Sequence, residues 1–336
     1  MAETQTTQLW DQRVDELGIS LEQSPVQPLV ERLYQELATS GIDFRPLVFV
    51  ANEWGCPDGI PLIGIPFYLV DPRFHPYEEE HADDLEEAER ILVGLRHEAG
   101  HAINYAYRLY DDPEWQAIFG AYDKDYHDDY RPEPFSRRCV RHLPGWYAQK
   151  HPDEDFAETF AVWLTPGLDW RQKYAGWEAL AKLEYMDNVL KRIGRKVPLI
   201  DPLSVTPDPD ELAFTVGDYY RRRAQADAPP VDEIGSFLDD DLREIFRADG
   251  PGTDASRLLW DRRRAIMRTV SAYTGARMYV VKALVVFLVQ RLRVMGVRAV
   301  GETDAIIAVT ALVTTLTQNF VRTGHFVSPP GRLAAA

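Results

Sequence analysis

The chain has 336 residues, enough for one large domain or two smaller ones. Its 45% hydrophobic and 27% charged residues are typical of a globular protein and exclude disordered, collagen-like and coiled-coil classes. The net charge of −16 is uneven, because residues 1–189 carry 16 Lys/Arg and 36 Asp/Glu whereas residues 190–336 carry 21 and 17. This excess of acid argues against nucleic acid as a partner of the first part, and the asymmetry suggests two regions with different roles.

No segment of the sequence predicts a membrane span or a secretory signal. The longest apolar runs, around residues 279–289 and 305–313, are shorter than the ~20 residues that cross a bilayer. The chain does not open with a basic stretch followed by an apolar one. Cys56 and Cys139 form neither a disulfide framework nor a CxxC knuckle. We therefore expect a cytoplasmic protein.

The first predicted elements mix helix and strand. Residues 1–40 have leucines at helical spacing and predict a helical segment. Short apolar runs over residues 46–51 and 60–70 predict a β-hairpin or meander, and prolines in the second run place part of it at a sheet edge. An acidic stretch over residues 78–89 predicts the start of a helix that continues to Tyr110.

The later elements are mostly helical. Asp153 is a plausible N-cap for a helix over residues 154–164, and a further helix is expected over residues 177–190. Residues 257–298, with ten Lys/Arg against one Asp, predict one or two basic helices. An apolar helix over residues 304–320 follows.

The stretch His97-Glu98-Ala99-Gly100-His101 is an HExxH motif inside a predicted helix. Residues i and i+4 share one helix face, so both imidazoles can reach one metal ion. Glu98 can then address the water rather than the metal. Gly100 is small, which lets another element pack closely against this helix.

Two histidines do not complete a catalytic zinc site, which usually has three protein ligands and a water molecule. Glu154 and Glu158 lie one helical turn apart, so one carboxylate can bind the metal while the other accepts the second ring N–H of a ligand histidine. The spacing by itself leaves open which glutamate takes which role.

The HEAGH motif together with the run from Tyr147 to Phe160 resembles the zinc-binding metallopeptidases of bacteria. These are gluzincins, more distantly similar to the lethal-factor catalytic domain, and the resemblance covers about residues 40–190. It implies that Glu154 is the third zinc ligand, that Glu158 supports a ligand histidine and that Tyr147 polarises the substrate carbonyl. Asp155 departs from the pattern, since an aromatic residue is common there in lethal factor.

The expected function is therefore zinc-dependent hydrolysis of a peptide bond, with one Zn²⁺ per chain and Glu98 as general base. The alternatives are a catalytically silent zinc-binding regulatory or interaction protein and a zinc amidase that acts on a non-peptide amide. The presence of Glu98 argues against a silent site, because a pure binding module needs no base.

Substrate and partners follow from the same interpretation. We expect an extended peptide to pair with the free edge of the strand before the HExxH helix, at Leu62, Ile63, Gly64 and Ile65. The basic C-terminal helices are expected to dock on the acidic catalytic region or on a second subunit, because the charges are complementary.

The predicted fold class is α+β, with a small zincin-like sheet, the HExxH helix, a second ligand helix and a mostly α-helical C-terminal region. The predicted divisions are an N-terminal helical segment (1–40), a gluzincin-like zinc metallopeptidase domain (41–190), a Pro-rich connector (191–256), a basic helical region (257–325) and a tail (326–336).

Overall fold

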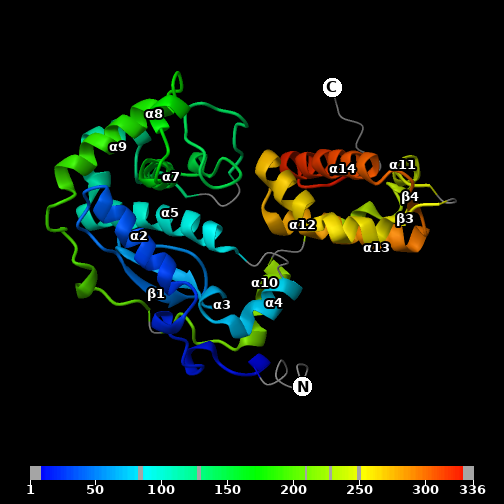
Figure 1. Ribbon diagram of the computed structural model, residues 1–336, viewed down its shortest axis with the longest axis horizontal. Coiled ribbons are helices and arrows are strands. Elements are labelled where there is room, and N and C mark those ends of the chain that lie inside the picture. The colour runs from blue at the N-terminus through cyan, green and yellow to red at the C-terminus, as the bar shows by residue number, and fades with distance from the viewer. Residues whose placement is uncertain are drawn as a thin grey trace. The chain divides into compact units, whose positions relative to one another are not determined.

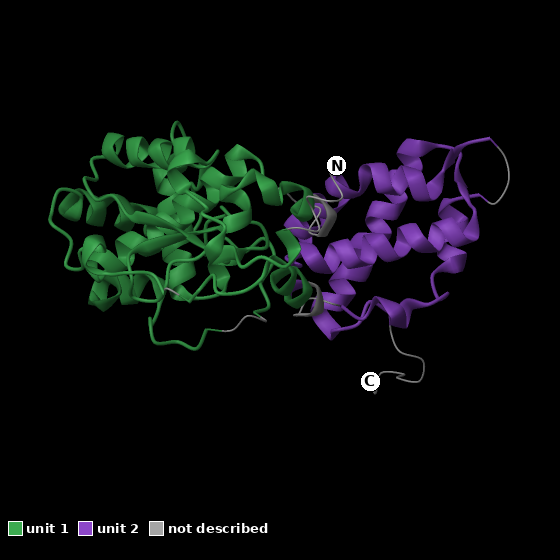
Figure 2. Cartoon of the chain, turned by 90° about the horizontal axis from the view of Figure 1, so that it is seen from below, with its two compact units in different colours: residues 1–222 green, residues 223–336 purple. Residues whose placement is uncertain are grey.

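The computed structural model describes residues 9–81, 86–126, 130–208, 210–226, 229–247 and 251–327 (Figure 1). The chain divides into two compact units, Met1–Arg222 (unit 1) and Arg223–Ala336 (unit 2), coloured separately in Figure 2. The division falls inside helix α10 (Val216–Ala226), within the stretch expected to be a connector. That stretch also contains helix α11 (Asp239–Ile245), so it is partly helical.

Unit 1 combines helices with a small sheet, which is compatible with the predicted α+β class. Its strands are β1 (Leu47–Ala51) and β2 (Leu62–Pro66). Besides α10, the α-helices bounded within the described residues of unit 1 are α2 (Gln27–Thr39), α3 (Phe67–Val70), α4 (His75–His81), α5 (Ala88–Tyr107), α6 (Pro113–Phe119), α7 (Pro152–Leu164), α8 (Trp170–Lys173) and α9 (Ala179–Ile193).

The two strands of unit 1 pair in parallel over all five residues, so the predicted hairpin or meander is wrong. The connection returns along the side of β2 away from β1, where Gly55 and Gly64 exchange two backbone hydrogen bonds of 2.8 and 3.4 Å. Only glycine fits at position 64, because a Cβ there would lie 2.8 Å from the Cβ of Ala51. After Pro66 the chain turns into α3, so the strand ends before the predicted Val70.

Helix α5 carries the HExxH motif through the core of unit 1. Every residue from Leu95 to Tyr107 is buried, so the motif lies on a rigid, fully packed element. The helix begins at Ala88, later than predicted, and the separate helix α4 precedes it; residues 82–85 of the acidic stretch lie outside the described residues. It ends at Tyr107, not Tyr110, because Arg108 adopts a left-handed conformation (φ 50°).

Helix α7 packs closely against α5. A Cβ added to Gly100 of α5 would lie 2.7 Å from the Cα of Ala157 of α7, so the predicted role of Gly100 in close packing is confirmed. The helix begins at Pro152, and its N-cap is His151, whose Nδ1 accepts the Asp153 amide at 3.1 Å. Asp153 is therefore not the cap, and its carboxylate is available to another partner.

Unit 2 is mostly helical and has its own apolar core. The predicted basic segment forms two helices, which Gly275 (φ 75°) separates. Phe326 and Val327 are buried, so the start of the predicted tail belongs to this core, while residues 328–336 lie outside the described part. Besides α11, the strands and α-helices in the described part of unit 2 are β3 (Thr253–Asp254), α12 (Ala255–Thr274), α13 (Met278–Met295), β4 (Arg298–Ala299) and α14 (Glu302–Thr323).

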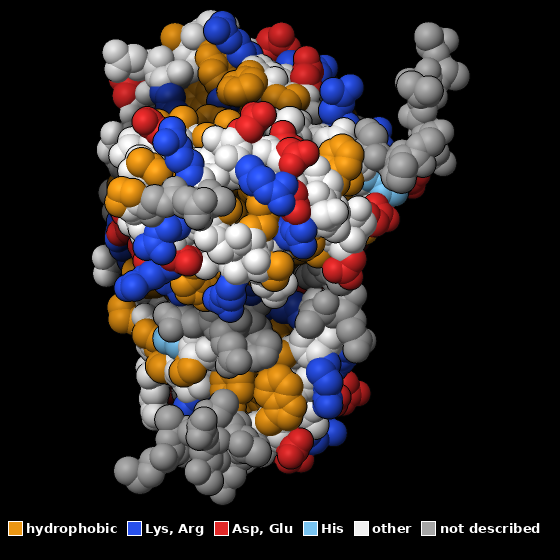
Figure 3. All heavy atoms as spheres, turned by 90° about the vertical axis from the view of Figure 1, so that its right-hand side faces the viewer, with side chains coloured by type: hydrophobic (Ala, Val, Ile, Leu, Met, Phe, Trp, Pro, Cys, Tyr) orange, Lys and Arg blue, Asp and Glu red, His pale blue; other side chains and the backbone are white. Residues whose placement is uncertain are grey.

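Among the described helices, α14 alone is long and apolar enough to cross a membrane by length and composition. The same helix places Val309, Val313 and Leu316 in the core of unit 2. A core helix passes the same test, so this is weak evidence for a membrane span. On the face drawn in Figure 3, Lys and Arg side chains are scattered among acidic and apolar ones.

Candidate metal centre

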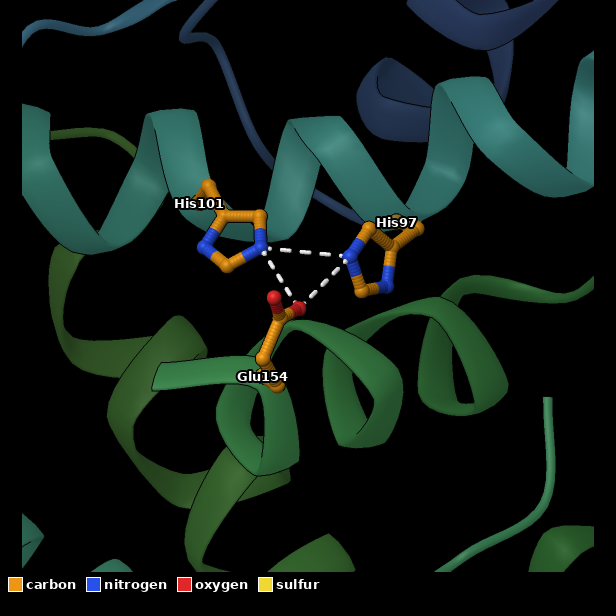
Figure 4. Close-up of side chains that lie close together, drawn as sticks. All are labelled: His97, His101 and Glu154. Atoms are coloured by element: carbon orange, nitrogen blue, oxygen red, sulfur yellow. Dashed lines mark hydrogen bonds and ion pairs between the residues drawn. The ribbon is translucent and has the colours of Figure 1, made fainter. Parts of the chain in front are cut away.

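His97, His101 and Glu154 come together between α5 and α7, and their ligand atoms all lie within 4.8 Å of one another (Figure 4). Glu154 Oε2 lies 3.0 Å from the Nε2 atom of His97 and 3.2 Å from that of His101. The two Nε2 atoms are 3.2 Å apart. All three side chains are buried, so the arrangement is fixed by packing and not by chance contact at a surface.

A carboxylate holds the other ring nitrogen of each histidine. Glu158 lies 3.0 Å from Nδ1 of His97, and Asp153 lies 2.8 Å from Nδ1 of His101. A carboxylate accepts hydrogen bonds, so each Nδ1 donates its proton away from the centre, and Nε2 is the nitrogen that can bind a metal ion once its own proton has left. This is the orientation that a metal-binding histidine requires.

The two supporting carboxylates are fixed in turn. The second oxygen of Glu158 accepts the backbone amides of His142 at 3.1 Å and Leu143 at 2.9 Å. Asp153 accepts the Asn104 side-chain amide and the Tyr105 hydroxyl, both at 2.6 Å. The histidine rings therefore rest on a hydrogen-bond network that reaches the backbone, which limits their freedom to turn.

The same contacts shift the pKa values of the central groups. Burial lowers the pKa of His97, but its hydrogen bonds to Glu154 and Glu158 outweigh burial and raise it to about 9. Burial opposes ionisation of Glu154, yet the hydrogen bonds from His101 and His97 hold the pKa of this carboxyl well below its usual range. Without a metal, the centre is thus a cation–carboxylate cluster, and a metal ion must displace protons to bind.

Glu98 and the triad line a pocket of about 450 Å³. Burial is the main cause that raises the pKa of Glu98, while the neighbouring histidines act in the opposite direction. A carboxylate with raised proton affinity, placed beside a metal centre, is suited to accept a proton from water. The other lining residues are Trp54, Gly55, Cys56, Asp58, Tyr105, Tyr122, Lys124, Tyr126, Tyr147, His151 and Asp153.

Tyr147 lies in this pocket, with its ring centre 5.6 Å from that of His97. It belongs to a 3-10 turn just before α7, and the preceding Trp146 adopts a left-handed conformation (φ 55°) that directs the chain into the turn. Burial and the charge of Glu154 raise the pKa of Tyr147, so its hydroxyl keeps its proton. A protonated hydroxyl at this place is a hydrogen-bond donor to a bound group.

The substrate strand predicted at Leu62–Ile65 is not available for pairing. All of β2 is buried, with β1 on one side and Gly55 bonded to Gly64 on the other. No residue of β2 lines the pocket, whereas Trp54, Gly55 and Cys56 do. This prediction was wrong because the sequence does not show that the connection folds back over the strand.

Two functional contacts were missed by the sequence interpretation. Asp153 is predicted as a helix cap but is the partner of His101, and Tyr126, whose hydroxyl donates to Glu154 Oε1, has no predicted role. The order of the contacts shows that α5 and α7 are antiparallel, because His97 lies beside Glu158 while His101 lies beside Glu154. Continuing that order brings Asp153 beside Asn104 and Tyr105, but no sequence signal points to Tyr126.

The donor set fits zinc. Two imidazole nitrogens and one carboxylate oxygen converge on a common point. Catalytic zinc is typically bound by three ligands of these types, with one position left for water. The carboxylates on both Nδ1 atoms are the partners that zinc-binding histidines usually have. The buried His-His-Glu cluster is therefore a candidate metal site whose donors suit zinc.

Comparison with known proteins agrees with this geometry. Residues 75–174, 100 of the 336, match the model of a family described as "Putative zinc-binding metallo-peptidase". Searches of curated proteins and of solved structures found no match. The matched stretch contains His97, Glu98, His101 and Glu154, so the metal centre lies in a region similar to this zinc-binding metallopeptidase family.

Proposed function

We propose that this protein is a zinc-dependent metallopeptidase of the gluzincin type, which hydrolyses a peptide bond in a peptide or protein substrate. The observation that carries the proposal is the convergence of His97, His101 and Glu154 in a pocket that Glu98 also lines. The similarity of residues 75–174 to a metallopeptidase family supports the same reaction class. The presence of a buried carboxylate that is not a ligand favours hydrolysis over a silent binding site.

In the proposed mechanism, His97, His101 and Glu154 hold the zinc ion. When bound, zinc acts as a Lewis acid that lowers the pKa of water and polarises the carbonyl group. Glu98 accepts the proton of the attacking water as it adds to the carbonyl carbon, and then delivers this proton to the leaving amine. Glu158 and Asp153 keep both histidine rings in place during the reaction.

Tyr147 is proposed to donate a hydrogen bond to the oxyanion that develops on the substrate. Its raised pKa keeps the hydroxyl protonated at neutral pH, as this role requires. Tyr147→Phe should lower kcat while the zinc affinity stays close to that of the wild type. An unchanged kcat would remove Tyr147 from the mechanism without affecting the metal site.

The proposed contact with the substrate backbone moves from β2 to the connection that covers it. Gly55 uses both its N–H and its C=O on Gly64, so a peptide would pair with the backbone of the neighbouring Trp54 and Cys56. Both residues line the pocket, and neither has a backbone–backbone hydrogen bond among the described residues. An extended peptide pairing there should lose affinity when the amides that face Trp54 and Cys56 are N-methylated, but not when the alternate amides are.

The basic helices of unit 2 are proposed to dock on the acidic unit 1 of the same chain or of a second copy. Residues 1–222 carry 22 Lys/Arg and 41 Asp/Glu, whereas residues 223–336 carry 15 and 12. Such docking should weaken as salt is raised. Small-angle scattering at low and high salt measures it, and scattering curves that do not change with salt would contradict it.

The test of the proposed function is cleavage of a peptide library by the zinc-loaded protein, compared with the chelated protein and with Glu98→Gln. The wild type should cleave peptides only with metal, and Glu98→Gln should bind zinc normally while losing roughly 10²–10⁴-fold in activity. Zinc binding without any cleavage would support a silent regulatory protein. Cleavage confined to non-peptide amides would support an amidase.

A further inference from the structure

The two carboxylate oxygens of Glu154 have different neighbours. Oε2 faces both ligand histidines, at 3.0 Å from His97 and 3.2 Å from His101. Oε1 accepts the hydroxyl of Tyr126. A carboxylate can bind a metal ion through one oxygen or through both, so the partner of Oε1 influences which mode is adopted.

The backbone beside Tyr126 is attached to the helix that carries Glu154. His151 accepts the Asp153 amide through Nδ1 at 3.1 Å, so its Nε2 carries the proton and donates to the Lys124 carbonyl at 2.9 Å. The ammonium group of Lys150 lies 4.1 Å from the centre of the Tyr126 ring. These contacts position the hydroxyl of Tyr126 relative to the start of α7, and hence relative to Glu154.

We propose that Tyr126 is a positioning residue that restricts Glu154 to metal binding through Oε2 alone. By occupying Oε1, its hydroxyl keeps the ligand set at two nitrogens and one oxygen and preserves an open position for water or substrate. The ring of Tyr126 is 52% exposed and lines the pocket, so this control is exerted from the substrate side. The inference rests on the zinc site of the proposed function but not on peptide hydrolysis.

The test compares Tyr126→Phe with the wild type after zinc is replaced by Co²⁺, whose visible absorption weakens as its coordination number rises. In Tyr126→Phe, Oε1 loses the hydroxyl of Tyr126 and can approach the metal, so the absorption should weaken. Zinc X-ray absorption should show an additional oxygen neighbour. The zinc affinity should change by about 10-fold, the scale expected when a partner of a ligand is lost.

Tyr122→Phe is the matched control. Tyr122 lines the same pocket and lies four residues earlier, but its hydroxyl donates to Asp58 at 2.5 Å and not to Glu154. This variant should keep the wild-type Co²⁺ spectrum. Identical spectra and zinc affinities for wild type and Tyr126→Phe would overturn the inference, as would an equal change in both variants.

The outcomes also separate this inference from the proposed function. A wild type that binds neither zinc nor Co²⁺ would overturn both. A metal-bound wild type that cleaves no peptide, with the predicted spectral change in Tyr126→Phe, would support the role of Tyr126 and contradict the peptidase. Because Tyr126 is half exposed, Tyr126→Phe should fold normally. Replacement of Tyr126 by 3-fluorotyrosine keeps the hydroxyl but makes it more acidic, so it should shift the zinc affinity through the hydrogen bond to Glu154.

Discussion

The two units of this chain differ most in what they bury. Unit 1 buries ionisable side chains, including Arg96, Glu98, Glu154 and Glu158. The described part of unit 2 buries no charged side chain, and its buried polar residues are all hydroxyl-bearing: Ser256, Ser271, Thr274 and Thr317. Burying a charge is unfavourable unless it is paired, so each buried charge in unit 1 requires a partner.

The pairing of these charges shows two different uses. The Glu36–Arg96 pair, with two hydrogen bonds of 2.7 Å, joins α2 to α5 one residue before His97. The cluster of His97, His101 and Glu154 instead directs its atoms at a common point. Unit 1 therefore contains charges that hold helices together and charges that form a site. Since the site lies in unit 1, we expect bound metal to change the stability of unit 1 far more than that of unit 2.

The largest expected effect is the loss of zinc when a ligand is removed. Glu154→Ala should nearly abolish zinc binding, because only two histidine nitrogens remain. Glu158→Gln and Asp153→Asn should weaken binding by only ~10–100-fold, since they orient ligands and do not bind the metal. Titration with a zinc indicator measures all three. A greater loss in Glu158→Gln than in Glu154→Ala would exchange the two roles.

The next effect concerns the core of unit 2. Leu284 is fully buried in α13, so Leu284→Ala should lower the free energy of unfolding of this unit by about 2–5 kcal/mol. Zinc affinity should not change. Val294, 77% exposed on the same helix, supplies the control, and Val294→Ala should stay within about 0.5 kcal/mol of the wild type. Chemical denaturation followed by circular dichroism, with and without zinc, tests whether the units are energetically separate.

The pH dependence of zinc binding should reveal the charged cluster. The pKa of His97 is raised to about 9, and that of His101 is also raised because the contacts with Asp153 and Glu154 outweigh burial. While the histidines are protonated the metal must displace their protons, so the apparent affinity should rise with pH, about tenfold per pH unit for each proton released, and the share of His97 should level off above about pH 9. An affinity that is constant between pH 6 and pH 8 would show that the metal-free histidines are neutral.

The smallest effect is expected at Asp187 of α9. Burial opposes its ionisation, but hydrogen bonds from Lys191, Arg171 and Trp163 outweigh it and lower the pKa of this carboxyl. A lowered pKa contributes stability above the unfolded value and loses it as the pH falls through the folded value. Asp187→Asn should therefore cost at most about 1 kcal/mol at pH 7 and nothing in strong acid. A difference that persists in acid would assign the effect to packing.

Much of the site was predictable because it depends on local periodicity. The i, i+4 spacing of His97 and His101 places both rings on one helix face, and the same spacing relates Glu154 to Glu158. Gly100 could be recognised as a packing position because the residue between two ligands must allow close approach of another helix. The main helices followed from periodicity and end signals, with boundaries shifted by a few residues.

The remaining features depend on contacts between segments distant in sequence. Whether β1 and β2 pair in parallel is decided by the path of the connection, which returns over β2 through Gly55 and closes the edge that was expected to bind substrate. Asp153 became a histidine partner because α7 starts at Pro152 and His151 takes the cap. Tyr126 reaches Glu154 from a loop 28 residues away, which no periodic pattern specifies. Local spacing determined the ligands, whereas tertiary packing decided what orients them and what covers the strand.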